Sequence, residues 1–384
     1  MSGRRTNGEG TVYYNKSRKR YEGQVTVRDL RTGKKSRRKV SGPTKAKVLE
    51  LMREVRERGE RGSALPANTT VGDWLEHWMS EILPGEPIKE STRWSYIGMA
   101  RRHLLPPLGD IKLTELQPAD VRAVLAAMGK RGLAGDTIRL ARTTLNKALK
   151  AAMVDGHLNR NVASLVSGPR RDRTPRRSMT TDQVTALLDA ASGSQIEAII
   201  HMLLATALRR SEVLGLSWRD VDLAANPPTI SVVNGLTVVN GRLNLGPPKT
   251  AKSQRRVFIP ERTAEVLKAL KSRQNRERLA AGPAWGEGWD GYDFVFTTPI
   301  GTPLDPSNLR ARLKPILEAA GIGHWKIHEM RHTAASQMMI GGVPLKEVSE
   351  ALAHSSISIT ADIYGHLLEP SRAATEVIGK VMYG

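Results

Sequence analysis

Two stretches without hydrophobic periodicity divide this sequence and exclude a single compact domain. Residues 59–68 and 168–178 consist mainly of Gly, Ala, Pro and polar or charged residues, and neither has regularly spaced apolar positions. The patterning changes across each of them, and 384 residues suffice for two or three domains. We therefore predict domains at residues 1–62, 69–167 and 179–384. The segment 168–178, which contains five Arg, is predicted to be a basic linker.

The first domain is predicted to be a small α+β unit with a strongly basic composition. Runs of β-branched and aromatic residues that are typical of strands lie at 11–14, 21–28 and 35–40. Residues 45–58 have the 3.6-residue period of a helix. Segment 1–62 holds 19 Lys+Arg against 7 Asp+Glu, a net charge of +12. A three-stranded sheet plus a helix with this charge favours DNA binding over a merely solvated basic face.

The second and third domains differ in secondary structure. Helical periodicity predominates in the second, with helices predicted at 73–82, 91–105, 118–128 and 136–154. In the third, helices alternate with strand-like runs, predicted at 229–233, 236–239, 255–259 and 294–297. The predicted fold class is therefore multidomain: a small α+β N-terminal domain, an all-α domain, and a mixed, mainly α-helical domain with a small β-sheet.

The charge balance indicates a polyanionic partner. The chain has 59 Lys+Arg against 38 Asp+Glu, and neutralising phosphates with such cations releases condensed counterions. A membrane partner is not expected, because the longest apolar stretch, 196–208, is interrupted by Glu197 and His201 and is too short to span a bilayer. The first ten residues have no apolar core, so no signal peptide is expected. Nucleic acid is the predicted partner, and 168–178 is either a solvated tether or a further phosphate contact.

The absence of cysteine removes several chemistries at once. Disulfides, thiol catalysis and cysteine-based zinc sites are excluded. The sequence also lacks a P-loop and a carboxylate cluster. A chain without cysteine is typical of a reducing compartment, which favours a cytoplasmic protein.

Five polar clusters follow one another in the third domain. They are Thr206-Ala207-Leu208-Arg209-Arg210-Ser211-Glu212, Pro248-Lys249-Thr250, His328-Glu329-Met330-Arg331-His332-Thr333, Leu352-Ala353-His354-Ser355 and Tyr364-Gly365-His366. Taken singly, each is more typical of a solvated charge, a structural histidine or a half-buried aromatic. Together they place Arg, Lys, His-x-x-Arg, His and Tyr in one ordered set, which chance rarely produces.

This set resembles the catalytic signature of the phage-integrase family of tyrosine recombinases. That family carries an Arg in a Thr-Gly-Leu-Arg-x-x-Glu context, a Lys on a β-hairpin, His-x-x-Arg, a His or Trp after Leu-Gly, and a Tyr shortly after. Further matches to the family's helical core-binding domain, a SAM-like fold, are Thr92, Tyr96, His103, Pro106 and Gly109. Residues 8–58 resemble the family's arm-type DNA-binding domain.

By this resemblance the chain is predicted to be a site-specific DNA recombinase of the integrase type. Residues 1–62 would form the arm-type DNA-binding domain, 69–167 the core-binding domain and 179–384 the catalytic domain. The resemblance assigns catalysis to six residues, which are Arg209, Lys249, His328, Arg331, His354 and Tyr364.

Physical chemistry supports these roles. A phosphodiester gathers charge on its non-bridging oxygens in the transition state, and the planar, permanently charged groups of Arg209 and Arg331 suit that charge. Tyr364 is the predicted nucleophile, and its free pKa near 10 means that a base or a positive field must help it ionise. His328 is the predicted general base or acid, and Lys249, on a hairpin tip, is predicted to protonate the leaving 5′-oxygen.

The remaining polar residues of the clusters receive supporting roles. His354 is expected to hydrogen-bond a non-bridging oxygen, and Glu212 to orient Arg209 or His328. We interpret His332 and His366 as structural histidines or as neighbours that support the site. Arg210 is interpreted as a DNA-backbone contact or a solvated side chain.

The resemblance also implies a reaction cycle and partners. Tyr364 would form a 3′-phosphotyrosine and release a 5′-hydroxyl, and a 5′-hydroxyl from a partner duplex would reverse the step without ATP or metal. The expected partners are double-stranded DNA attachment sites and three further copies of the chain, in a tetramer that exchanges strands through a Holliday junction. Residues 367–384 would dock on a neighbouring protomer. A host DNA-bending protein and an excisionase are further candidate partners, and the expected location is the bacterial nucleoid.

Three positions depart from the family pattern, and alternatives remain open. Ala207 and Ala353 replace Gly, and Val162 replaces Pro; alanine suffers relative to glycine only where φ is positive. One alternative is a catalytically inactive DNA-binding architectural or regulatory protein, against which the complete catalytic set argues. A resolvase or a transposon recombinase of the same catalytic family is another alternative, and the basic N-terminal domain argues against the resolvase. A type IB topoisomerase is the last, over which the N-terminal domain and the Tyr-x-His context favour a recombinase.

Overall fold

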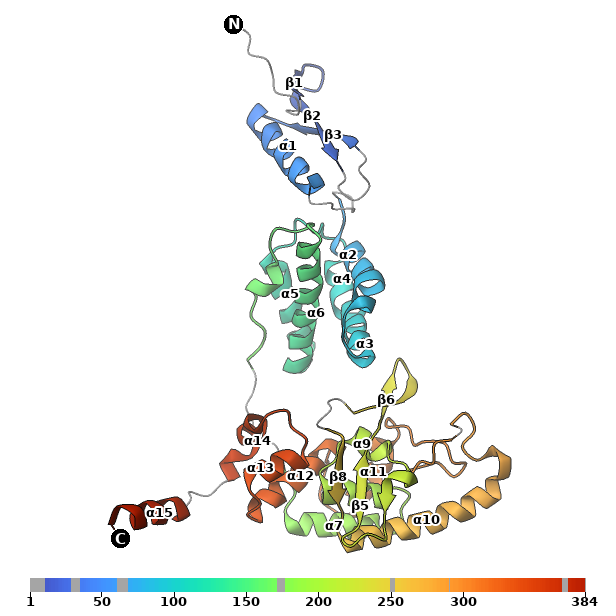
Figure 1. Cartoon of the computed structure of the whole chain (residues 1–384). Coiled ribbons are helices and arrows are strands. Elements are labelled where there is room, and N and C mark those ends of the chain that lie inside the picture. The colour runs from blue at the N-terminus through green and yellow to red at the C-terminus, as the bar shows by residue number, and fades with distance from the viewer. Residues whose placement is uncertain are drawn as a thin grey trace. The chain divides into compact units, whose positions relative to one another are not determined.

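The computed structural model describes residues 11–28, 35–60, 68–170, 177–248, 253–289, 291–367 and 372–383. The chain divides into two compact units, Met1–Asp172 and Arg173–Gly384. Figure 1 shows a sheet-and-helix part and a helical part in the first unit, and a mixed, mainly helical second unit. The predicted fold class is therefore confirmed.

The N-terminal part is an antiparallel sheet with one helix on it. Its elements are β1 (Thr11–Asn15), β2 (Arg20–Arg28), β3 (Lys35–Gly42) and α1 (Lys45–Glu60), with the strands in the order β1-β2-β3. The small core between sheet and helix contains Val25, Val48 and Met52. Gly23 lets α1 pack this closely, because a Cβ at this position would lie 2.6 Å from the Met52 sulfur.

The second part of the first unit is all-helical. Its elements are α2 (Val71–His77), η1 (Trp78–Ile82), η2 (Leu83–Gly85), α3 (Glu90–Met99), η3 (Ala100–Leu104), α4 (Leu105–Leu108), α5 (Pro118–Lys130), α6 (Gly135–Val154) and η4 (Val162–Leu165). Trp74 and Trp78 are fully buried, and Trp74 Nε1 donates to the Ala148 carbonyl at 2.8 Å. Both tryptophans are thus core residues, as their helical spacing indicates.

The second unit is mainly helical. Its helices are α7 (Thr181–Ala191), α8 (Glu197–Thr206), α9 (Arg210–Leu214), η5 (Trp218–Asp220), α10 (Glu261–Ala281), η7 (Gly282–Ala284), α11 (Leu309–Ala319), α12 (Ile327–Ile340), α13 (Leu345–Ala351), α14 (Ile357–Tyr364), η8 (Gly365–Leu367) and α15 (Arg372–Tyr383). Its strands are β4 (Val221–Asp222), β5 (Thr229–Val232), β6 (Gly235–Val239), β7 (Arg242–Gly246) and β8 (Arg255–Phe258).

The strands of this unit form a three-stranded antiparallel sheet, β4-β5-β8, and a separate hairpin, β6-β7. The hairpin turns at Asn240 and Gly241, which both have positive φ, as a two-residue hairpin loop of this composition requires. The predicted strand at 294–297 is wrong. Phe294 and Thr297 make only isolated bridges, to Ser217 and Pro303, because this apolar run is buried without a neighbouring strand to pair with.

The large apolar core of this unit positions the helices that carry the polar clusters. Six of the ten residues of α8 are buried, and α12 packs against α8, α13 and α14. A smaller cluster surrounds the end of α14 and contains Ala207, Ala334, Ala335, Met339, Val348, Leu352 and Tyr364. Helices α12, α13 and α14 therefore form one group, which Figure 1 shows in orange to red.

Two other kinds of feature are absent among the described residues. None of their helices is long and apolar enough to cross a membrane. Within the same ranges, no group of three or more His, Cys, Asp or Glu side chains is arranged to hold a metal ion.

Candidate active site

The turn between α8 and α9 positions Arg209. Apolar α8 ends at Thr206, and Ala207 reverses the chain with φ of +52°. Arg209 then occupies the N-cap of α9, where its backbone N–H donates to Glu212 Oε2 at 3.0 Å. The spacing of Arg and Glu by three residues therefore closes one helical turn and fixes the direction of the arginine side chain.

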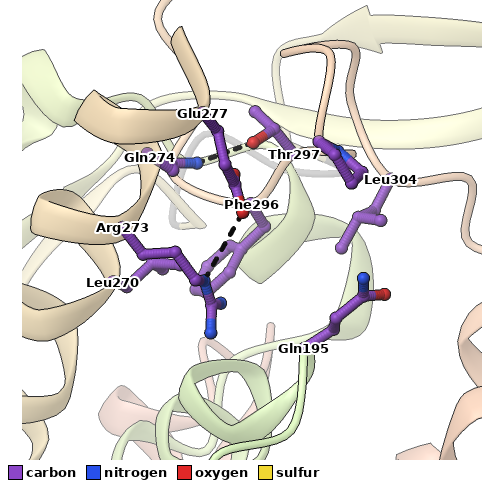
Figure 2. A pocket seen from close by; sticks show the side chains of 9 residues that line it. Gln195, Leu270, Arg273, Gln274, Glu277, Phe296, Thr297 and Leu304 are labelled. Carbon is purple, nitrogen blue, oxygen red and sulfur yellow. Dashed lines mark hydrogen bonds and ion pairs between the residues drawn. The ribbon is translucent and has the colours of Figure 1, made fainter. Parts of the chain in front are cut away.

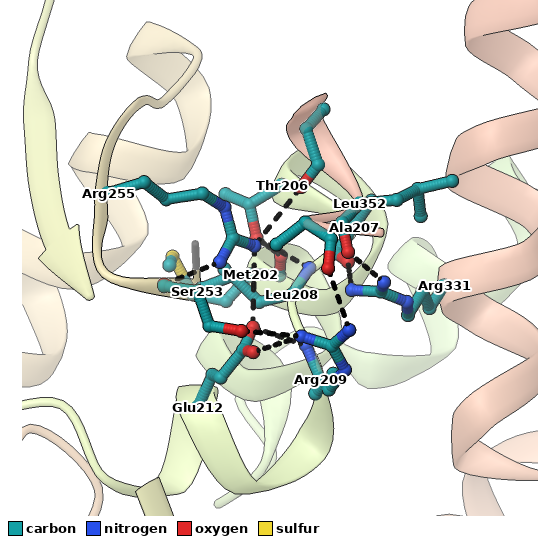
Figure 3. A network of polar contacts seen from close by, with 12 residues as sticks. Met202, Thr206, Ala207, Leu208, Arg209, Glu212, Ser253, Arg255, Arg331 and Leu352 are labelled. Atoms are coloured by element: carbon teal, nitrogen blue, oxygen red, sulfur yellow. Dashed lines mark hydrogen bonds and ion pairs between the residues drawn. The ribbon is translucent and has the colours of Figure 1, made fainter. Parts of the chain in front are cut away.

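A buried carboxylate joins two arginines in this site. Glu212 is 2% exposed; its Oε1 accepts from Arg209 Nη1 at 2.7 Å and its Oε2 accepts from Arg255 Nη2 at 3.3 Å. Ser253 Oγ accepts from Arg209 Nη1 at 3.3 Å, and its carbonyl accepts from Arg255 Nη1 at 2.9 Å. Figure 3 shows this network. It ties α9 to the chain just before β8, and Arg209 is the guanidinium that Glu212 orients.

Arg331 is held deeper in the protein. Its side chain, on α12, is 3% exposed and donates to the carbonyls of Ala207, at 2.5 Å, and of Leu352. Burial, followed by the charge of Arg209, lowers the pKa of Arg331 to about 10. The group therefore remains a cation at neutral pH; burial lowers its pKa most, Arg209 and Arg255 lower it further, and Glu212 opposes the shift.

The two alanines that depart from the family pattern both adopt the left-handed conformation. Ala207 has φ of +52° and Ala353 has φ of +46°. The Ala207 carbonyl accepts from Arg331, and the Ala353 carbonyl accepts from Arg209 Nη2 at 3.1 Å. Each strained residue thus presents its carbonyl to one of the two arginines, which explains why a residue with little or no side chain stands there.

This geometry predicts different tolerances at Ala353. Replacement by glycine relieves about 1–2 kcal/mol of left-handed strain but loses a methyl contact and raises unfolded-state entropy, so the free energy of unfolding stays within about 1 kcal/mol. Valine adds a β-branched side chain to a buried left-handed position and lowers that free energy by about 2–5 kcal/mol. Thermal melting of Ala353→Gly and Ala353→Val tests this, and equal stability of the two variants would contradict it.

His354 follows directly and is held by α14. Its Nδ1 lies 2.8 Å from Thr360 Oγ1. Burial, followed by the charges of Arg331 and Arg209, lowers the pKa of His354 to about 4. The imidazole is therefore neutral at pH 7, and Nε2 is its second nitrogen for a hydrogen bond to a substrate.

Tyr364 ends α14 and is packed inside the small cluster around α12. Its side chain is 2% exposed, and its hydroxyl lies within hydrogen-bond distance of His332 Nδ1. The ring of His332 in turn meets that of His328 edge-on, with centroids 5.0 Å apart. His328 itself is exposed. The exposed His328 and the half-buried His332 thus lie on one face of α12, and His332 contacts the buried Tyr364 of α14.

Five of the six predicted catalytic residues lie in the described part of the second unit, together with Glu212. Lys249 and its expected hairpin tip lie outside the described residues, and the turn that the structure does describe in this region is Asn240-Gly241. Arg210 Nη1 donates to the Pro306 carbonyl at 3.2 Å, so it is a loop contact in this structure. Three residues that the sequence did not single out for catalysis contact the predicted ones: Ser253 contacts Arg209, Arg255 contacts Glu212, and His332 contacts Tyr364.

A small cavity elsewhere in this unit is structural. It holds about 20 Å³, room for roughly one water, between α10 and the segment 296–304. Figure 2 shows that Gln274 reaches Thr297 there, at 2.7 Å, and Gln274 also donates to the Val295 carbonyl. Gln274 additionally accepts from Trp218 Nε1 at 2.7 Å. Its side-chain amide therefore links α10 to Trp218 and to the segment 295–297.

Comparison with known proteins gives the same assignment for most of the chain. The model described as "Phage integrase family" matches residues 177–370, and one described as "Phage integrase, N-terminal SAM-like domain" matches 70–128. An "Integrase" of Streptomyces ambofaciens is 32% identical over 96% of this chain and 95% of its own. A "Tyrosine recombinase XerC-like" protein of Caldanaerobacter subterraneus subsp. tengcongensis is 29% identical over 93% of this chain and 95% of its own.

Solved structures share the fold at lower identity. The Tn1549 transposon integrase in complex with a circular intermediate DNA gives a TM-score of 0.66 at 20% identity, covering 80% of this chain and 99% of that chain. A lambda integrase tetramer bound to a Holliday junction gives 0.58 at 17% identity, covering 96% of this chain and 99% of that one.

Fold and site together define an enzyme that breaks and rejoins DNA strands. The chain belongs to the phage integrase family, and it is a tyrosine-type site-specific recombinase. The family and reaction class predicted from the sequence are thereby confirmed.

Proposed function

We propose that this chain cuts and rejoins double-stranded DNA at attachment sites through a covalent bond between Tyr364 and a 3′-phosphate, and so integrates or excises a phage or another mobile element. One observation carries the residue assignment. Arg209 donates a hydrogen bond to the Ala353 carbonyl, and Arg331 donates one to the Leu352 carbonyl. The chain continues from these two residues into His354 and then into α14, which ends at Tyr364. Two guanidinium groups, a neutral imidazole and a phenol therefore belong to one connected site.

The charge of the site favours an anion. Arg209, Arg255 and Arg331 are gathered around a single carboxylate, Glu212, and the pKa of Arg331 is lowered partly by Arg209 and Arg255. A scissile phosphate would supply the missing negative charge and remove this repulsion. Because the charge grows on the non-bridging oxygens as the reaction proceeds, the transition state benefits more than the ground state.

The proposed steps use each side chain in turn. Tyr364 Oη attacks the phosphorus, and Arg209 and Arg331 bind the non-bridging oxygens. His354 donates from Nε2 to one of these oxygens, and His328, exposed on α12, takes part in proton transfer. Lys249 protonates the 5′-oxygen that leaves. In the second step a 5′-hydroxyl of the partner duplex attacks the phosphotyrosine and releases Tyr364.

Tyr364 has to leave its packed position for this reaction. Tyr364 is 2% exposed, so a DNA backbone cannot reach it in this position. Assembly on DNA would draw out α14, so that cleavage is tied to the assembled complex. This fits a recombinase, in which isolated strand breaks would be harmful.

The other parts of the chain receive matching proposals. Residues 1–62 act as the arm-type DNA-binding domain, 69–167 as the core-binding domain, and 168–178 as a basic linker. The enzyme acts as a tetramer, and α15, whose Val377 and Val381 are 60% and 80% exposed, docks on a neighbouring protomer. A host DNA-bending protein and an excisionase would assist it at the bacterial nucleoid.

The direct test is covalent trapping. Wild type and Tyr364→Phe are incubated, in a chelator, with labelled duplexes that carry candidate core sites and a nick that lets the cleaved fragment diffuse away. We expect a protein–DNA adduct on a denaturing gel for wild type and none for Tyr364→Phe. Tight DNA binding without an adduct on confirmed core sites would instead indicate the inactive DNA-binding alternative.

A further inference from the structure

His332 is the side chain that the structure places on the tyrosine hydroxyl. It lies on α12, directly after Arg331 and one turn after His328. Its Nδ1 lies within hydrogen-bond distance of Tyr364 Oη, and the two ring centroids are 5.9 Å apart. The spacing of His328 and His332 by four residues puts both on one face of the helix, with His332 on the side of Tyr364.

The packing around α12 makes this contact specific. Tyr364 belongs to one buried apolar cluster with Ala334, Ala335 and Met339 of α12 and with Val348 and Leu352. Small residues on α12 let the aromatic ring lie close to the helix. The hydroxyl then lies within hydrogen-bond distance of the imidazole of His332.

The chemistry of the two groups suits a proton transfer. A phenol with a pKa near 10 is a poor nucleophile until its proton is removed, whereas a neutral imidazole, with an ordinary pKa near 6.5, can accept that proton at neutral pH. His332 is half-buried and lies beside the buried side chain of Tyr364.

We propose that His332 accepts the phenolic proton of Tyr364 during cleavage and returns it during rejoining, a catalytic role that rests on the proposed function of Tyr364. The Tyr364 Oη–phosphorus bond forms while the bond from phosphorus to the 5′-oxygen breaks. The phenolic proton passes to His332 Nδ1, and the leaving 5′-oxygen takes its proton from Lys249. Rejoining runs these transfers backwards, so His332 ends the cycle neutral. His328 is thereby left to serve the exposed, substrate-facing side of α12.

The first experiment measures single-turnover cleavage of the nicked duplex by His332→Ala and His332→Gln. General base catalysis contributes about 10²–10⁴-fold, so both variants should lose cleavage by that factor. Glutamine keeps a hydrogen-bond partner for the phenol but cannot take its proton. Imidazole added to His332→Ala should restore part of the rate, more strongly for more basic imidazoles, and should not accelerate wild type. The matched control is His324→Ala, an exposed histidine just before α12 that should cleave normally.

A second substrate separates this role from that of the leaving-group acid. With a 5′-bridging phosphorothiolate the leaving sulfur needs no proton, so a Lys249→Ala defect should disappear while the His332→Ala defect persists. Disappearance of both defects would place His332 at the leaving group and overturn the proposal. Wild-type rates in His332→Ala, or full activity in His332→Gln, would also overturn it, yet would leave the proposed function intact as long as Tyr364→Phe forms no adduct.

Discussion

Replacing Glu212 with alanine is expected to lower the free energy of unfolding of the catalytic unit by about 3–5 kcal/mol. Glu212 is 2% exposed and pairs with both Arg209 and Arg255. Removing a buried carboxylate leaves two guanidinium groups facing each other without a counter-charge, and burial already lowers the pKa of Arg255. The loss should therefore exceed that of any exposed ion pair in this unit.

Hydrogen exchange of the full-length protein measures this locally, because backbone amides of α8 and α12 report the opening of this unit alone. Glu265→Ala is the matched control: Glu265 pairs with Arg262 at 2.9 Å but is half-exposed, and exposed pairs contribute about 0–1 kcal/mol. A Glu212→Ala variant no less stable than Glu265→Ala would show that the network in Figure 3 does not hold the site together.

Replacing Arg331 with methionine is expected to slow cleavage by about 10³-fold or more, since arginines on transferring phosphoryl groups contribute about 10³–10⁵-fold. Methionine preserves an unbranched apolar side chain in the buried part of the site but removes the charge and both carbonyl contacts. Arg331→Lys should be nearly as slow, because a lysine cannot form the two contacts to Ala207 and Leu352 at once.

The control for this prediction is Arg210→Met. Arg210 neighbours Arg209 in sequence, but its guanidinium contacts the Pro306 carbonyl outside the network, so cleavage should change only a few-fold. Rates are compared at saturating DNA, so that weaker binding is not read as slower chemistry. Equal losses in Arg331→Met and Arg210→Met would mean that general positive charge, rather than the held geometry of Arg331, drives the reaction.

Local patterns account for the parts of the fold and of the proposed site that could be predicted from the sequence. Arg209 and Glu212 are three residues apart, and so are His328 and Arg331, so one helical turn brings each pair together without knowledge of the tertiary fold. The helical domain followed from periodicity and from caps such as Thr70 with Asp73. Family resemblance then supplied roles that spacing alone leaves open.

Long-range contacts explain what was missed. Ser253 and Arg255 lie 44 and 43 residues from the Arg209 and Glu212 side chains that they contact, and nothing in their own local sequence marks them. His332 stood beside a stronger motif and was interpreted as structural or supporting, since only the packing of α14 on α12 reveals its contact with Tyr364. The run 294–297 was predicted to be a strand because a short buried apolar segment has the same sequence pattern whether or not it pairs with a neighbouring strand.

Ala207 and Ala353 show that the effect of replacing glycine with alanine can be judged only when the backbone φ angle is known. The sequence alone indicated that alanine for glycine matters where φ is positive, and the structure shows that both Ala207 and Ala353 are such positions. Their strain is tolerated because each carbonyl is fixed by an arginine. The departure from the family pattern therefore lies directly beside the two arginines of the proposed site.

The most direct test of the whole account is to locate the DNA-linked residue in the trapped adduct. The chain has seven tyrosines, and trypsin should release residues 347–372, in which Tyr364 is the one tyrosine. After nuclease digestion of the adduct, mass spectrometry should find a nucleotide phosphate on this peptide and on no other. A nucleotide on a peptide that contains Tyr292 or Tyr383 would contradict the account, because neither residue belongs to the network of Arg209, Arg331 and His354.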